Sequence, residues 1–201
     1  MLGRLNKTKT LMIAISLIAM TVLSACETTV SSPVIPELSF KHLPALKFAV
    51  GRIETVENYR SPLRPPNVEH LFPTPISAAL RRWSDDRLKA EGGTNVMQVI
   101  IEDASVVLEE LETNKDLEGL FTNEQAERVD AHIQVRIEIT DENGTVLAFT
   151  NTEAVRSRTT PENVSLSQRD RIYNDLTMVL MNDFNTSQEQ SIRRYFDAYL
   201  K

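Results

Sequence analysis

The residues VDAHIQVRIEI, numbers 129–139, decide the fold of this chain, because apolar and polar side chains alternate strictly along them. A period of two predicts a β-strand with one face on a hydrophobic core and the other face in water. Asp141-Glu142-Asn143-Gly144 follows, and Asn-Gly is the dipeptide favoured in type I′ hairpin turns. The sequence therefore predicts that residues 145–158 return as the antiparallel neighbour of this strand.

Two more strands are predicted upstream of the alternating strand. Residues 46–53 are expected to form the first, and residues 95–111, which are rich in valine and isoleucine, a long second one. Between them, residues 59–75 contain five prolines. Each proline fixes φ and removes a hydrogen-bond donor, so this segment is predicted to be a loop.

Two helical regions complete the pattern. Thr74 and Pro75 are suited to open a helix as N-cap and first helical residue, and Gly92-Gly93 is expected to end it. The apolar stripe of that helix is Ile76, Ala79, Leu80, Trp83 and Leu88. Ser165 and Gln168 have the spacing of a capping box at the start of a second helix. Residues 185–187 are expected to break or bend it before an amphipathic stretch at 192–200.

The order β-α-β-β-β-α predicts an α+β fold. We expect a mostly antiparallel sheet of about four strands with the helices packed on one face. Residues 46–201 are predicted to form this single domain, preceded by a flexible, proline-containing tether at 26–45.

The N-terminal segment has the features of a bacterial secretory signal. Its positive charges, at positions 4, 7 and 9, precede an apolar run at 11–23, which is short of the ~20 residues that span a bilayer. Leu23-Ser24-Ala25-Cys26 follows and resembles a lipobox. The resemblance implies that residues 1–25 are a lipoprotein signal peptide. It also implies that Cys26 receives a diacylglyceryl group and an amide-linked acyl chain such as palmitate.

A lipid on Cys26 implies a protein that is attached to a membrane without spanning it, since two or more acyl chains make a stable anchor. The alternative, a buried cysteine in an uncleaved membrane helix, requires a longer apolar run than this one. By the same resemblance, the domain lies in the periplasm, and Glu27 favours the outer membrane over the inner one.

The charge balance limits the classes of partner. Without residues 1–25, the chain carries 19 basic side chains against 28 acidic ones. An acidic domain does not favour nucleic acid, whose binding depends on neutralising phosphates. It also does not favour a polybasic contact with anionic lipid.

The side chains that carry chemistry do not form a recognisable catalytic or metal-binding motif. His42, His70 and His132 stand in three separate contexts with no second ligand at metal spacing. No Gly-x-Ser-x-Gly elbow and no phosphate-binding Gly-Lys-Ser/Thr sequence is present. We therefore expect no enzyme, no metal and no cofactor other than the covalent lipid.

Three surfaces are candidates for a binding site. Leu117, Leu120 and Phe121 lie inside the acidic connection at 109–127, where they either tuck back or form a docking patch. An arginine cluster near Pro161 is expected to be a solvated face rather than an anion clamp. Its members are Arg156, Arg158, Arg169 and Arg171. Tyr195, Phe196 and Tyr199 are expected to face the core rather than a partner.

The chain resembles small envelope lipoproteins. Weakly, it is similar to the auxiliary lipoproteins of ABC-type transport systems and to the lipopolysaccharide-assembly lipoprotein. The segments that carry the resemblance are the lipobox, Arg60-Ser61-Pro62-Leu63, Ala79-Leu80-Arg81-Arg82-Trp83 and the hairpin at 129–149. It implies a non-enzymatic subunit of an envelope assembly or lipid-transport system that acts through protein contacts. The alternatives are a carrier that holds a lipid between helices and sheet and, less favoured, an enzyme.

Overall fold

The computed structural model describes residues 38–112, 125–161 and 163–201. In chain order, the elements are β1 (Leu46–Phe48), β2 (Arg52–Glu57), the 3₁₀ turn η2 (Glu69–Leu71), α2 (Ile76–Arg87), β3 (Leu88–Ala90), β4 (Val96–Asp103), β5 (Val106–Glu110), β6 (Gln125–Thr140), β7 (Val146–Pro161), α3 (Leu166–Tyr195) and the 3₁₀ turn η4 (Asp197–Tyr199). The α+β class predicted from the sequence is confirmed.

One mixed sheet of five strands organises the fold. β6 pairs with β7 along one side, and with β4 and then β5 along the other. These three pairings are antiparallel, as expected, whereas β2 lies parallel to β4 at the edge of the sheet. A parallel pair needs a crossover connection, and α2 supplies it between β2 and β4. A second, two-stranded parallel sheet of β1 and β3 was not predicted.

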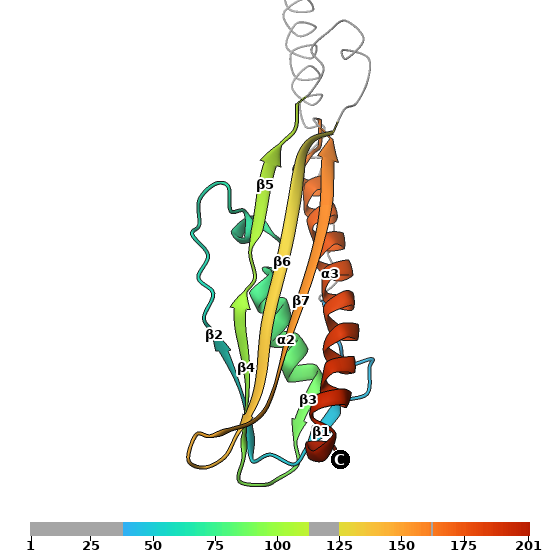
Figure 1. The fold of residues 1–201 in the computed structure, drawn as a ribbon. Helices are drawn as coiled ribbons and strands as arrows, with labels where there is room; N and C mark the ends of the chain where they lie inside the picture. The colour runs from blue at the N-terminus through green and yellow to red at the C-terminus, as the bar shows by residue number, and fades with distance from the viewer. Residues whose placement is uncertain (1–37, 113–124, 162) are drawn as a thin grey trace, which may run out of the picture. The chain divides into compact units, whose positions relative to one another are not determined.

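β6, β7 and α3 give the domain its long dimension (Figure 1). Each of the two strands has 16 residues and is about 50 Å long at ~3.3 Å per residue. α3 has 30 residues, about 45 Å at 1.5 Å per residue, and packs against β7. The predicted hairpin is therefore present, but its connection spans residues 141–145. The Asp141 carboxylate closes it by accepting the amide hydrogens of Asn143 and Thr145 at 2.9 and 2.8 Å.

Several predicted element boundaries are wrong, for tertiary reasons. The long strand at 95–111 is divided at Ala104-Ser105 into β4 and β5. The strand at 46–53 is likewise divided, into β1 and β2. Between them, Gly51 approaches the Gly93 backbone too closely for a side chain. α2 begins after Pro75, which is its N-cap, and it ends at Arg87 rather than at the glycine pair. The residues after Arg87 pair with β1 instead.

α3 continues through residues 185–187, where a break or bend was expected. The Asn185 side chain accepts hydrogen bonds from the Trp83 indole N–H at 2.9 Å and from the Arg87 guanidinium at 3.1 Å. Because its oxygen is occupied by α2, it does not compete for the backbone of its own helix. The capping box at the start of α3 is confirmed, since Ser165 and Gln168 each accept a hydrogen bond from the other's backbone amide.

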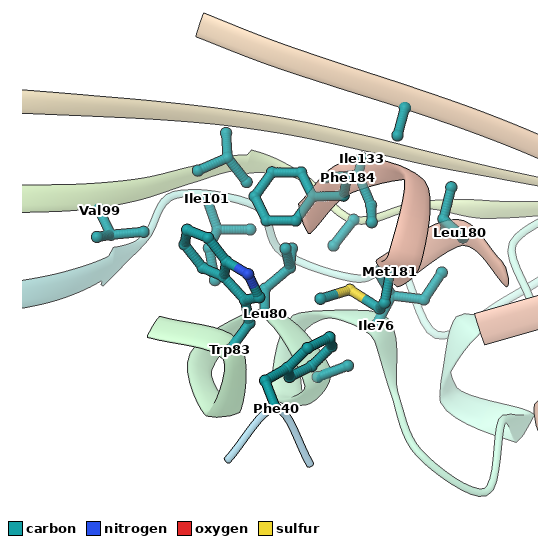
Figure 2. Packing of buried hydrophobic residues seen from close by; sticks show 14 of the residues in the cluster. Phe40, Ile76, Leu80, Trp83, Val99, Ile101, Ile133, Leu180, Met181 and Phe184 are labelled. Carbon is teal, nitrogen blue, oxygen red and sulfur yellow. The ribbon is translucent and has the colours of Figure 1, made fainter. Parts of the chain in front are cut away.

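The core lies between the sheet and the two helices. All six apolar residues of the alternating stretch in β6 are buried, which confirms that prediction. Trp83 of α2 packs edge-on against Phe184 of α3 with ring centroids 5.0 Å apart. Figure 2 shows these rings with Leu180, Met181 and Ile133 filling the space between helices and sheet. This is the volume that a lipid carrier would need to leave open.

Residues 38–45, at the end of the predicted tether, pack against α2. Phe40 is buried, and its amide donates to the carboxylate of Asp86 at 2.8 Å. The Ser39 hydroxyl donates to the same carboxylate at 3.1 Å. Arg87 donates to the carbonyl of Pro44. The compact part of the chain therefore includes this segment.

Candidate functional site

The residues singled out from the sequence as sites are not described by the structure. Cys26, the predicted lipidation site, and Leu117, Leu120 and Phe121, the predicted partner-binding residues, all lie outside the described residues. Both assignments stay predictions. The candidate sites among the described residues are surfaces of the sheet and of the proline-rich loop.

The edge of β7 that faces away from β6 is the first such surface. Among the described residues, β7 has backbone pairing with β6 alone. The outer edge of β5, by contrast, is covered by the proline-rich loop, since Val68 donates to the carbonyl of Val106 and Leu108 donates to that of Pro66. An unpaired strand edge is a template for the addition of another strand.

Apolar side chains stand on the solvent face of β7 beside this edge. Val146, Leu147, Phe149 and Val155 are all exposed, whereas Thr150 and Thr152 face the core. We call these four residues the β7 patch. Arg136 of β6 lies over the Phe149 ring, with 4.3 Å from its guanidinium carbon to the ring centroid. Such a cation–π contact holds the ring in place on the surface.

A groove runs between the β7 edge and α3. It has a volume of about 340 Å³ and is lined by β7 residues 153–156 together with Asp183, Thr186 and Ser187 of α3. Arg156 crosses it to form an ion pair with Asp183 at 2.7 Å. The helix side of the groove is formed largely by small polar side chains, which allow close approach of a partner.

Neither Phe149 nor Val155 was predicted as a site residue. The returning strand was predicted, but its two faces were not assigned. The register opposes Phe149 to Glu138 and Val155 to His132, both on the polar face of β6. The sequence could have placed both residues on the solvent face, because cross-strand partners lie on the same face of a sheet and the hairpin connection sets the register.

His132 forms the most pronounced electrostatic feature of the solvent face of the sheet. Its Nδ1 lies 2.7 Å from a carboxylate oxygen of Asp103, and its Nε2 lies 2.8 Å from one of Glu153. Only the imidazolium form donates from both nitrogens. Partial burial opposes that charge, but the hydrogen bonds to the two carboxylates outweigh it and raise the pKa of His132 above its ordinary value. The ring thereby links β4, β6 and β7.

The proline-rich loop encloses a second polar centre. Glu69 is buried, and its carboxylate accepts hydrogen bonds from the Tyr59 hydroxyl at 2.7 Å and the Val106 amide at 3.3 Å. Burial opposes ionisation of Glu69, but hydrogen bonds from Ser61 and Tyr59 outweigh it and lower its pKa below the ordinary value. A pocket of about 190 Å³ adjoins this carboxylate.

Several of the remaining candidates from the sequence have structural roles. Arg156 is paired with Asp183, and Arg169 lies 3.4 Å from Glu127, so the arginine cluster is partly neutralised. Phe196 is buried in the core and Tyr199 packs against it, as expected. Tyr195 is 57% exposed, so the prediction that it faces the core is wrong.

Neither a metal site nor a membrane span is found in the described residues. Within residues 38–112, 125–161 and 163–201, no group of three or more His, Cys, Asp or Glu side chains is arranged to hold a metal ion. None of the helices in that part of the chain combines the length and apolarity that crossing a membrane requires.

Comparison with known proteins gives distant structural likenesses only. No protein-family profile and no curated protein sequence matches the chain. Among solved structures, it is similar to a minor lipoprotein from Acinetobacter baumannii, with 12% identity, 72% of this chain and 94% of that one covered, and a TM-score of 0.37. It is also similar to rare lipoprotein B from Shewanella oneidensis, with 8% identity, 72% and 96% covered, and a TM-score of 0.33. A third similar structure is a Xanthomonas campestris protein, with 9% identity, 79% of this chain and 96% of that one covered, and a TM-score of 0.30. With TM-scores this low, the likenesses carry no argument about the function of this chain.

Proposed function

We propose that this protein is a non-enzymatic lipoprotein of the bacterial envelope that acts through contacts with other proteins. Its membrane attachment is the lipid expected on Cys26, which follows a charged and then an apolar segment in the order of a lipoprotein signal. Two acyl chains suffice for stable attachment, at about 0.8 kcal/mol per buried methylene. The domain then lies on the periplasmic face of the outer membrane, in keeping with Glu27 after the cysteine.

The observation that carries the contact function is the long outer edge of β7 beside the β7 patch, which has no strand partner among residues 38–112, 125–161 and 163–201. A partner segment that adds to this edge gains main-chain hydrogen bonds from β7 and apolar contacts with Phe149 and Val155. The groove between β7 and α3 accommodates the side chains that point to the other face. The partner is an extended segment of another subunit of an envelope assembly or lipid-transport system.

A carrier function has less support. A carrier requires an apolar cavity of at least about 300 Å³. The space between helices and sheet is filled by core side chains (Figure 2). The larger described cavities, of about 640 and 520 Å³, are open grooves lined mostly by polar and charged residues of α3 and α2.

The contact function is tested by photocrosslinking in cells. A photoreactive amino acid at Asn151 or Val155 on the solvent face of β7 is expected to capture a discrete protein, identified by mass spectrometry. The matched control is the same amino acid at Lys89, an exposed residue of β3. Ser187→Phe narrows the groove and should reduce the adduct. Equal capture from Lys89, or capture of lipid alone from β7, would contradict the proposal.

The lipid anchor is tested separately. Cys26→Ala should remove the lipid and release the protein from the membrane fraction, while Cys26→Ser gives a second lipid-free variant of closer size. Membrane fractionation of both variants, with the wild type as reference, measures the effect. Persistence of the variants in the membrane fraction would refute the anchor but would leave the β7 contact untouched.

A further inference from the structure

The pocket beside Glu69 has the size of a single side chain. Its volume is about 190 Å³, below the roughly 300–1,000 Å³ of small-molecule sites. The proline-rich loop forms one wall and the first turn of α2 the other. The apolar part of its lining is Tyr59, Leu63, Pro75, Ile76 and Ala104. A narrow, mostly apolar pocket of this kind fits the aliphatic stem of a long side chain.

The polar end of the pocket is a buried anion. Glu69 is 4% exposed, and the side-chain and main-chain groups that donate to its carboxylate, from Tyr59, Ser61 and Val106, are neutral. Within the described residues, no lysine, arginine or histidine forms an ion pair with it, whereas nearby Glu57 is paired with Arg81. Buried charges in proteins are as a rule paired with an opposite charge.

The mouth of the pocket presents apolar surface. Leu63 lines the pocket and is 66% exposed, and its backbone has the left-handed φ of 56°, which few leucines adopt. Leu71, next to the pocket residue His70, is 54% exposed. A free amine would leave this apolar surface in water. A polypeptide that carries a cationic side chain would cover it.

We propose that this pocket receives one lysine or arginine side chain of a partner protein, with Glu69 as the counter-ion and Leu63 in contact with the residues beside that side chain. The charge complementarity between a cationic head and the Glu69 carboxylate, which has no ion-pair partner among the described residues, determines the chemistry of the occupant. This inference rests on the proposed contact function and adds a second contact, distinct from the β7 edge.

The test is a binding titration on the lipidated full chain in dodecyl maltoside micelles, with labelled leucine and isoleucine methyl groups. The probes are Nα-acetyl-lysine N-methylamide and its arginine equivalent, and the control is the norleucine analogue, which has a similar stem without the charge. We expect the cationic probes to shift the Leu63 and Ile76 methyl signals with about tenfold higher affinity than the control. Equal shifts of the methyl signals for the two cationic probes and the norleucine control, or no shift at a probe concentration of about 20 mM, would overturn the proposal.

Two variants identify the site. Ser77→Phe, on the first turn of α2, places a ring in the pocket while the Glu69 residue is kept, and it should abolish the shifts. The matched control is Asn182→Phe on the exposed side of α3, which should leave the shifts unchanged. Glu69→Gln should remove the preference for the cationic probes. Glycerophosphoethanolamine is included as a lipid headgroup, and shifts as strong as those of the lysine probe would assign the pocket to lipid and overturn the proposal. All of these measurements use purified protein, so they fail or succeed independently of the crosslinking from β7.

Discussion

Replacing Arg87 with alanine is expected to destabilise the domain by about 3–5 kcal/mol, the cost of breaking a buried ion pair. The Arg87 side chain is only 1% exposed, although it is charged. It donates to the carbonyl of Pro44, to the side-chain oxygen of Asn185 and to the carboxylate of Glu189. Its removal takes one donor from each of these three acceptors, although Asn185 keeps Trp83 and Glu189 keeps Arg193. It also removes a link from α2 to α3 and to the segment before β1.

Arg193 provides a matched control, because it binds the same carboxylate from the solvent side. Its guanidinium lies 2.7 Å from Glu189, and its side chain is 60% exposed. A surface pair of this kind contributes about 0–1 kcal/mol. Arg193→Ala should therefore have little effect on the free energy of unfolding, since Glu189 keeps Arg87 as its partner.

The assays are urea unfolding and thermal unfolding, each followed by tryptophan fluorescence. Trp83 is the only tryptophan of the chain, is buried, and donates its indole N–H to Asn185 beside Arg87. For a domain of this size, 1 kcal/mol corresponds to about 2–4 °C, so Arg87→Ala should lower the melting temperature by roughly 6–20 °C. A loss below about 1 kcal/mol, or equal losses for the two variants, would refute the argument that burial makes this pair essential.

Three further predictions use the same unfolding measurement. Raising the pH should lower the free energy of unfolding by deprotonating His132, because the pKa of this side chain in the fold lies above its ordinary value. The stabilisation is complete below about pH 6.5 and is lost as the pH rises through the raised pKa, and His132→Gln should abolish this part of the profile. Ser165→Ala should lower the free energy of unfolding by about 1 kcal/mol, because it removes the N-cap of α3. An unchanged free energy would show that the capping box does not stabilise the domain. Gly51→Ala should cost about 1–3 kcal/mol, because its Cβ would lie 2.6 Å from the Gly93 carbonyl oxygen, and wild-type stability would show that this contact yields easily.

Local periodicity was a reliable guide where burial follows the local backbone. The six inward positions of β6 are all buried because alternate residues of a strand face opposite sides of the sheet. The start of α3 was also predicted correctly from the sequence, since Ser165 and Gln168, three residues apart, each accept a hydrogen bond from the other's backbone amide. Both features depend on residues that are close in the sequence.

Periodicity did not locate the surfaces on which the proposals rest. The apolar residues Phe149 and Val155 lie on the solvent face of β7, against the usual relation between apolarity and burial. The pocket beside Glu69 forms only when the loop after β2 folds back onto β5 and α2. A sequence pattern does not contain the distance between such segments.

By itself, the sequence determined the α+β class, the long hairpin with its buried face and the capped start of α3. Only the tertiary structure decided that β2 lies parallel to β4, that residues 95–111 form two strands, and that α3 continues past Asn185. Trp83 and Asn185 are 102 positions apart, and their hydrogen bond takes up the side chain that would otherwise favour a break in the helix. The physical reason is that short-range patterns record which face of an element is buried. Where an element divides, ends or continues depends on partners that the fold brings from far along the chain.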